Sequence, residues 1–223
     1  STASYDSNFS VSSQESSPKG LAFNSDGTKM FVIGSSGDDV NEYTLSTGFD
    51  VSTASYDSNF SVSSQENAPT GLAFNSNGTK MFVIGWAGDD VNEYTLSTGF
   101  DVSTASYDSN FSVSSQESTP QGLAFNSNGT KMFVIGSSDD VNKYTLSTGF
   151  DVSTASYDSD FKVESQESAP KGLAFNSDGT KMFVTGYHGD DVNEYTLSTG
   201  FNLVDDSTAP TTTFSPANSA TAV

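Results

Sequence analysis

The chain has 223 residues with 28 Asp or Glu, 8 Lys and no Arg, so its formal net charge is -20 at pH 7. Such a surface repels nucleic-acid phosphates and anionic lipids, so neither nucleic-acid binding nor membrane insertion is expected. The absence of cysteine excludes disulfides, a thiol nucleophile and thiolate-bound metals. No apolar run approaches the length of about 18 residues that suggests a membrane-spanning helix.

The chain consists of four copies of one unit. The letters STASYDS begin each copy, at Ser1, Ser52, Ser103 and Ser153. The first two copies differ at only six positions, which indicates recent duplication. A fixed period of this kind sets the architecture, because each unit must bury its surfaces against its neighbours.

Each unit predicts four short strands, which in the first copy are residues 20–25, 29–34, 39–45 and 55–62. The first two are joined by DGTK or NGTK, and Asp-Gly and Asn-Gly are strong signals for a tight hairpin. The proline before each first strand falls in a connection, where its missing N–H is tolerated. Four antiparallel strands repeated every 50 residues or so predict an all-β fold, a β-propeller of four-stranded blades. A linear β-solenoid is the alternative.

The two ends of the repeat region are out of phase with the blade. The N-terminus supplies a fourth strand, Tyr5 to Val11, without the first three, and the last copy supplies three strands, Gly172 to Leu197. We therefore predict that the N-terminal strand pairs with the C-terminal blade and closes a ring of four blades. Two chains that form one eight-bladed ring are the alternative.

The stretch PKGLAFNSDGTKMFVIG at residues 18–34 resembles the inner strands of bacterial secreted β-propeller repeats of the YVTN and NHL kind. The resemblance covers residues 1–201 and implies the propeller fold, but it says little about function. The Thr-, Ser- and Pro-rich tail at 202–223 has the composition of a linker. From Asp206 it also resembles the start of a bacterial immunoglobulin-like domain. That resemblance implies an extracellular or cell-surface module of a larger secreted protein.

Most differences between copies lie in the turn between the second and third strands and in the blade-to-blade connection. This turn carries Trp86 in the second copy, and Tyr187 with His188 in the fourth. Aromatic rings of this kind could stack on sugars, and His188 could form a hydrogen bond to a ligand. The alternative is that surface loops drift because they tolerate change.

A pair of aspartates follows the variable residues in every copy. The pairs are Asp38 and Asp39, Asp89 and Asp90, Asp139 and Asp140, and Asp190 and Asp191. Calcium prefers six to eight oxygen ligands, so the pairs are candidate Ca²⁺ ligands. The alternative is that one aspartate of each pair caps a turn and the other is solvated.

Catalysis has weak support in the sequence, because His188 is the only histidine and each acid pair is repeated in every copy. We therefore predict that the chain is not an enzyme. The favoured function is a non-catalytic extracellular binding or adhesion module, with a glycan or surface polymer as ligand. A structural spacer or filament-building domain is the alternative.

Overall fold

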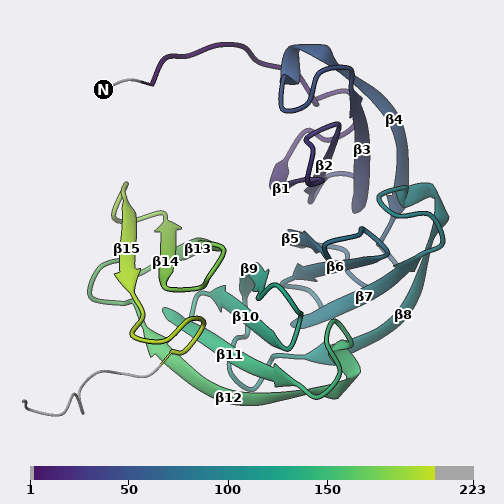
Figure 1. Cartoon of the computed structure of the whole chain (residues 1–223). Helices are drawn as coiled ribbons and strands as arrows, with labels where there is room; N and C mark the ends of the chain where they lie inside the picture. The colour runs from purple at the N-terminus through teal and green to yellow at the C-terminus, as the bar shows by residue number, and fades with distance from the viewer. Residues whose placement is uncertain (1–2, 204–223) are drawn as a thin grey trace, which may run out of the picture.

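The computed structural model describes residues 3–203 and contains four blades arranged as a β-propeller (Figure 1). Blade 1 consists of β1 (Pro18–Phe23), β2 (Lys29–Gly34), β3 (Asp39–Leu45) and β4 (Ala54–Ser61). Blade 2 consists of β5 (Pro69–Phe74), β6 (Lys80–Gly85), β7 (Asp90–Leu96) and β8 (Ala105–Ser112). Blade 3 consists of β9 (Pro120–Phe125), β10 (Lys131–Gly136), β11 (Asp140–Leu146) and β12 (Ala155–Lys162). Blade 4 consists of β13 (Pro170–Phe175), β14 (Lys181–Gly186) and β15 (Val192–Thr196).

The strands of each blade pair antiparallel in sequence order, as the repeat predicted. A 3-10 turn precedes each outer strand, and these turns are η1 (Val51–Thr53), η2 (Val102–Thr104) and η3 (Val152–Thr154). The predicted hairpin turn is also confirmed. In blade 1, Gly27 has a φ of 71°, and Asp26 Oδ1 accepts the backbone N–H of Thr28 at 3.0 Å. Glycine adopts this left-handed conformation without steric cost.

The core lies between blades. Phe31, Ile33 and Val40 on one face of blade 1 pack against Met81 and Tyr94 of blade 2. All five residues are 0% exposed. Equivalent clusters join blades 2 and 3 and blades 3 and 4. We call the face toward the next blade along the chain the leading face, and the face toward the preceding blade the trailing face.

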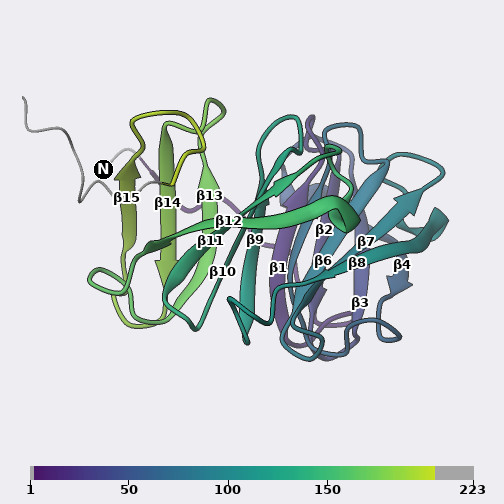
Figure 2. The same cartoon turned by 90° about the horizontal axis from the view of Figure 1, so that it is seen from below.

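The predicted ring closure within one chain is wrong for the part of the chain that the structure describes. Blade 4 has only three strands, and the segment from Tyr5 to Val11 forms no strand and pairs with none. The blades instead follow an open arc, with the N-terminal segment and β15 on opposite sides of the opening (Figure 1). Seen from below, the four sheets stand side by side around the arc (Figure 2). The physical reason is that packing of large side chains fixes the rotation between blades, and four such rotations do not bring the ends together.

The folded region extends slightly past residue 201. Leu203 is 2% exposed and packs in the cluster between blades 3 and 4, so residues 202 and 203 belong to the propeller. The tail from residue 204, where the immunoglobulin-like strand was predicted, lies outside the described residues. Among the residues described, no helix is long and apolar enough to cross a membrane.

Candidate functional site

The variable turns join the second and third strands of each blade and expose the aromatic residues that the sequence singled out. Trp86, in the turn after β6, is 54% exposed, and Tyr187, in the turn after β14, is 74% exposed. The rings of Tyr187 and His188 meet edge to face with centroids 5.5 Å apart. Trp86 lies on blade 2 and the other two lie on blade 4, so the chain does not bring all three candidates together.

A buried glutamate that sequence analysis missed holds each variable turn in place. Glu66 is 1% exposed, and its carboxylate accepts the backbone N–H groups of Ala68 at 2.7 Å and of Gly88 at 3.1 Å. The equivalents in the other blades are Glu15, Glu117 and Glu167. In a Ser-rich connection such a residue looks solvated. Its recurrence three residues before each proline was the available signal.

In blade 4, hydrogen bonds to backbone N–H groups also affect the titration of the buried glutamate. Burial acts to raise the pKa of Glu167, but the N–H groups of Ala169, Gly189 and His188 outweigh it and hold the pKa below its usual value. Glu167 is therefore a fixed anion that orders the turn.

The second aspartate of the pair accepts hydrogen bonds from amide groups at both carboxylate oxygens in blades 1 and 2. Asp39 Oδ1 accepts from Asn41 Nδ2 at 2.6 Å, and Asp39 Oδ2 accepts from Asn59 Nδ2 at 2.6 Å. Asp90 has the same two kinds of partner. In blade 3, Lys162 contacts Asp140 at 3.3 Å instead. In blades 1 and 2 these carboxylates thus join neighbouring strands, and each of their oxygens accepts one amide hydrogen bond.

The first aspartate of the pair is held under strain and lacks a partner for one oxygen. Asp38, Asp89 and Asp139 have φ values of 50°, 50° and 64°, a left-handed conformation that is uncommon outside glycine. The Oδ1 atom of each is buried without a hydrogen-bond partner among the described residues. Burial raises the pKa of Asp89, and the charges of Glu117 and Asp90 raise it further.

The pKa values of Asp38 and Asp139 are also raised, first by burial and then by neighbouring carboxylates. Such an arrangement makes a carboxylate a stronger base, and perturbed, poorly satisfied groups cluster at functional sites. Asp190, the equivalent residue in blade 4, is exposed. The structure therefore singles out three of the eight predicted aspartates.

Within residues 3–203, no group of three or more His, Asp or Glu side chains is arranged to hold a metal ion. Each pair belongs to a separate blade, and in blades 1 and 2 amide groups occupy one carboxylate of the pair. Calcium binding by the eight aspartates stays a prediction.

Comparisons with known proteins place this geometry in context. No family model matches the sequence, and no curated protein matches it. Among solved structures, a putative 6-phosphogluconolactonase from Bacteroides uniformis superposes with a TM-score of 0.57 at 12% identity, over 80% of this chain and 50% of that one. The periplasmic gluconolactonase of Pseudomonas aeruginosa superposes with a TM-score of 0.54 at 13% identity, over 80% of this chain and 49% of that one.

The shared fold is the β-propeller. A third similar structure, a β-propeller domain from Myceliophteria thermophila, has a TM-score of 0.53 at 8% identity and is covered over 54% of its length. The chain thus spans about half the length of the propellers that it resembles. At these identities the likeness establishes the fold. The finer YVTN- or NHL-like identity stays a prediction.

These comparisons correct the predicted function. A non-catalytic adhesion module, and a chain that is not an enzyme, were predicted because no catalytic constellation stood out in the repeats. The similar structures include a gluconolactonase and putative 6-phosphogluconolactonases, so this chain shares its fold with proteins named as enzymes, and the non-catalytic prediction is not kept.

Proposed function

We propose that this propeller hydrolyses the lactone of a sugar acid that carries no phosphate group. The observation that carries the proposal is the set of strained aspartates with raised pKa values beside the exposed variable turns. The likeness to gluconolactonases supports the reaction class. The net charge of -20 favours an uncharged substrate, because a phosphorylated lactone would be repelled.

Asp89 is the best candidate for the general base. It shares a turn with Trp86, whose exposed ring offers a flat apolar surface to a sugar. In the proposed reaction, the Asp89 carboxylate takes a proton from a water molecule as the water oxygen bonds to the lactone carbonyl carbon. The ring C–O bond then breaks, and its oxygen receives the proton, so an open sugar acid leaves. General-base assistance of this kind contributes roughly 10²- to 10⁴-fold to the rate.

The test is the initial rate of hydrolysis of glucono-1,5-lactone and of its 6-phosphate, measured by pH-stat above the spontaneous rate. We expect faster turnover of the unphosphorylated lactone, and a loss of about 10²-fold or more in Asp89→Asn. The matched control is Asp26→Asn, because the second and third copies carry Asn77 and Asn128 at that hairpin position. This control should keep the wild-type rate.

The pH profile provides a second readout. A general base must be ionised, so the rate should fall as the pH falls through the pKa of Asp89, which lies above 3.8. Asn also tolerates positive φ, and it removes a charge that burial disfavours. Asp89→Asn should therefore unfold at no lower temperature than wild type at pH 7. No hydrolysis of either lactone above the spontaneous rate, or an unchanged rate in Asp89→Asn, would contradict the proposal.

The predicted extracellular location and the aromatic ligand contacts of Trp86, Tyr187 and His188 remain part of the proposal. An acidic surface suits an exposed, salty environment because salt screens its self-repulsion. A sugar lactone would be a small soluble ligand of the turns rather than a surface polymer.

A further inference from the structure

We infer that two copies of this chain close one ring of eight blades, each copy lending its N-terminal segment to the last blade of the other. Neighbouring blades approach one another closely at their inner strands. An added Cβ on Gly20 would lie 3.4 Å from the Cα of Gly71, and one on Gly71 would lie 3.6 Å from the Cα of Gly122. Gly122 meets Gly172 in the same way, whereas Gly172 meets only the side chain of Thr185. Within the described residues, the glycine of blade 4 thus has no glycine of a following blade against it.

Two of the interfaces between blades contain a buried hydrogen bond. Glu42 on β3 accepts the backbone N–H of Val102 in η2 at 2.8 Å. Glu93 on β7 accepts the N–H of Val152 in η3 at 2.8 Å. In both cases a glutamate on a leading face meets the valine of an Asp-Val pair on the next trailing face.

The third interface uses a different pair. Lys143 replaces the glutamate and is buried, with 5% of its surface exposed. Its Nζ donates to Asn202 Oδ1 at 3.2 Å, and Asn202 with Leu203 stands where the other copies have Asp-Val. Each kind of interface therefore has its own pair of partners. A glutamate faces Asp-Val in one kind, and a lysine faces Asn-Leu in the other.

The free ends of the arc carry a matched pair of the first kind. Glu194 on the leading face of blade 4 has a 53% exposed side chain, whereas that of Glu42 is 1% exposed. On the trailing face of blade 1, the N–H of Val51 has no hydrogen-bond partner among the described residues. Val51 follows Asp50. Glu194 of one copy can thus accept the N–H of Val51 of a second copy, in the same contact that Glu42 makes with Val102.

Both free ends of the arc also expose apolar side chains that are buried at the interfaces between blades. Leu21 on the trailing face of blade 1 is 60% exposed, whereas its equivalents Leu72 and Leu123 are 9% exposed. It borders a groove lined also by Phe9, Val32 and Val51. On the leading face of blade 4, Val192 is 65% exposed, whereas Val91 is 0% exposed. Thr185 stands in place of isoleucine and makes this half slightly less apolar.

The N-terminal segment already lies where the outer strand of a preceding blade would lie. Phe9 meets Tyr43 edge to face with centroids 5.6 Å apart at 75°. Phe60 of the outer strand β4 meets Tyr94 of blade 2 at 5.5 Å and 75°. In this position the segment is the missing fourth strand of another blade.

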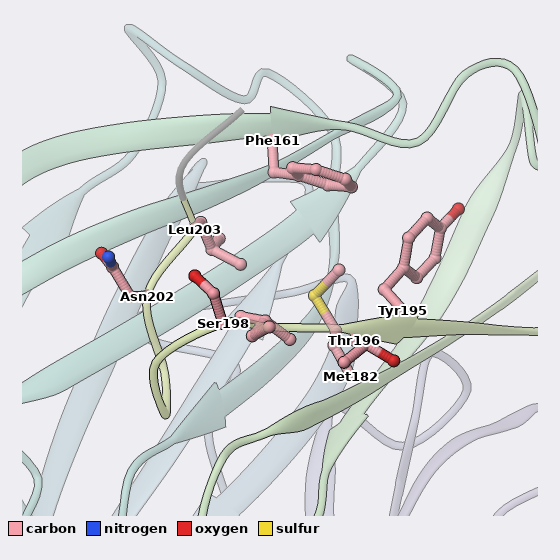
Figure 3. A pocket seen from close by; sticks show the side chains of 8 residues that line it. Phe161, Met182, Tyr195, Thr196, Ser198, Asn202 and Leu203 are labelled. Carbon is pink, nitrogen blue, oxygen red and sulfur yellow. The ribbon is translucent and has the colours of Figure 1, made fainter. Parts of the chain in front are cut away.

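That blade is blade 4 of the second copy. In blade 1, Val40 on the third strand pairs with Phe60 on the fourth strand, and the equivalent residues pair in blades 2 and 3. The same register pairs Val192 with Phe9 and places Tyr5 over Tyr195. Figure 3 shows Tyr195 beside the pocket that it lines with Phe161, Met182 and Leu203, at the edge left open by the missing strand. Tyr5 itself is 80% exposed.

A polar contact completes the same register. Asp191 accepts from Asn193 Nδ2 at 2.8 Å, as Asp39 does from Asn41, but it has no counterpart of Asn59. Asn8 of the second copy occupies that position. Eight blades lie within the usual range for propellers, and the chain spans about half the length of the propellers that it resembles. Head-to-tail contacts of this kind close a ring when the rotation permits.

Cysteine crosslinking tests the inference, because the chain has no cysteine of its own. Asn8→Cys and Asn193→Cys are made separately and mixed under oxidising conditions. We expect covalent pairs in the mixture and none in either variant alone. The variant that carries both substitutions should give a covalent two-chain species. Far-UV circular dichroism of each variant should match that of the wild-type chain.

Three outcomes would overturn the inference. A double variant crosslinked within a single chain would mean that four blades close on their own. A ladder of species larger than two chains would mean an open filament. Absence of any crosslink in folded variants would mean that these ends do not meet. The readout is independent of lactone hydrolysis, so the two proposals can fail separately.

Discussion

Replacing Phe82 with alanine is expected to lower the free energy of unfolding by about 3–5 kcal/mol. Phe82 is 0% exposed and lies between blades 2 and 3. Its ring centroid is 4.4 Å from that of Phe125 and 6.1 Å from that of Phe150. Deleting the ring leaves a cavity between two sheets whose backbones are fixed by their own ladders, so the site cannot collapse to fill it.

Guanidinium unfolding, followed by tryptophan fluorescence and circular dichroism, measures this loss. Phe82→Leu keeps most of the apolar volume and should cost clearly less. Trp86→Ala removes a larger but 54% exposed side chain four residues away, and it should change stability by no more than about 0.5 kcal/mol. Circular dichroism serves as the common probe, because this variant has no other tryptophan. Equal losses in Phe82→Ala and Trp86→Ala would contradict the packing of the interblade core.

The second large effect is expected for Glu93→Ala, with a loss of about 3–5 kcal/mol. The Glu93 side chain is 1% exposed and forms an ion pair with Lys80, which also contacts Asp108 at 2.7 Å. It also accepts the N–H of Val152 in the next blade. Its removal therefore leaves a buried donor unpaired and weakens the link between blades 2 and 3.

Glu93→Gln is the matched variant for this prediction. It keeps an acceptor for the N–H of Val152 and loses only the charge. Burial raises the pKa of Glu93, against the opposing effects of Lys80 and Val152, so a neutral side chain is tolerated there. We expect Glu93→Gln to lose clearly less stability than Glu93→Ala in the same unfolding measurement. A Gln variant as unstable as the Ala variant would show that the charge, rather than the buried hydrogen bond, dominates.

Most of the fold could be predicted from sequence because local signals agree with the repeat. The second strand of blade 1, Lys29–Gly34, was predicted to the residue, and the Asp-Gly turn before it formed as expected. Ring closure was predicted wrongly because strand counting cannot give the rotation between blades. That rotation depends on how the large side chains of two sheets interlock.

Less of the candidate site could be predicted. The sequence located the variable turns and the paired aspartates, but it did not separate Asp89 from Asp90. Their difference lies in the left-handed backbone of Asp89 and in the two amide groups that donate hydrogen bonds to Asp90. The sequence also gives no sign that Lys143 is buried, because its partner Asn202 lies 59 residues away in the chain. Only the fold shows that the two substitutions compensate each other.

In the proposed assembly four blades form half of a closed ring, and the mass of the particle in solution distinguishes this ring from a single chain. Sedimentation equilibrium at micromolar concentration should give twice the 23.4 kDa of one chain, without further growth as the concentration rises. Val192→Asp places a charge at the proposed contact and should give single chains. Lys162→Ser, at an exposed position where other copies have Ser61 and Ser112, should stay paired. A mass of one chain for the wild type, or one that rises continuously with concentration, would rule out the two-chain ring.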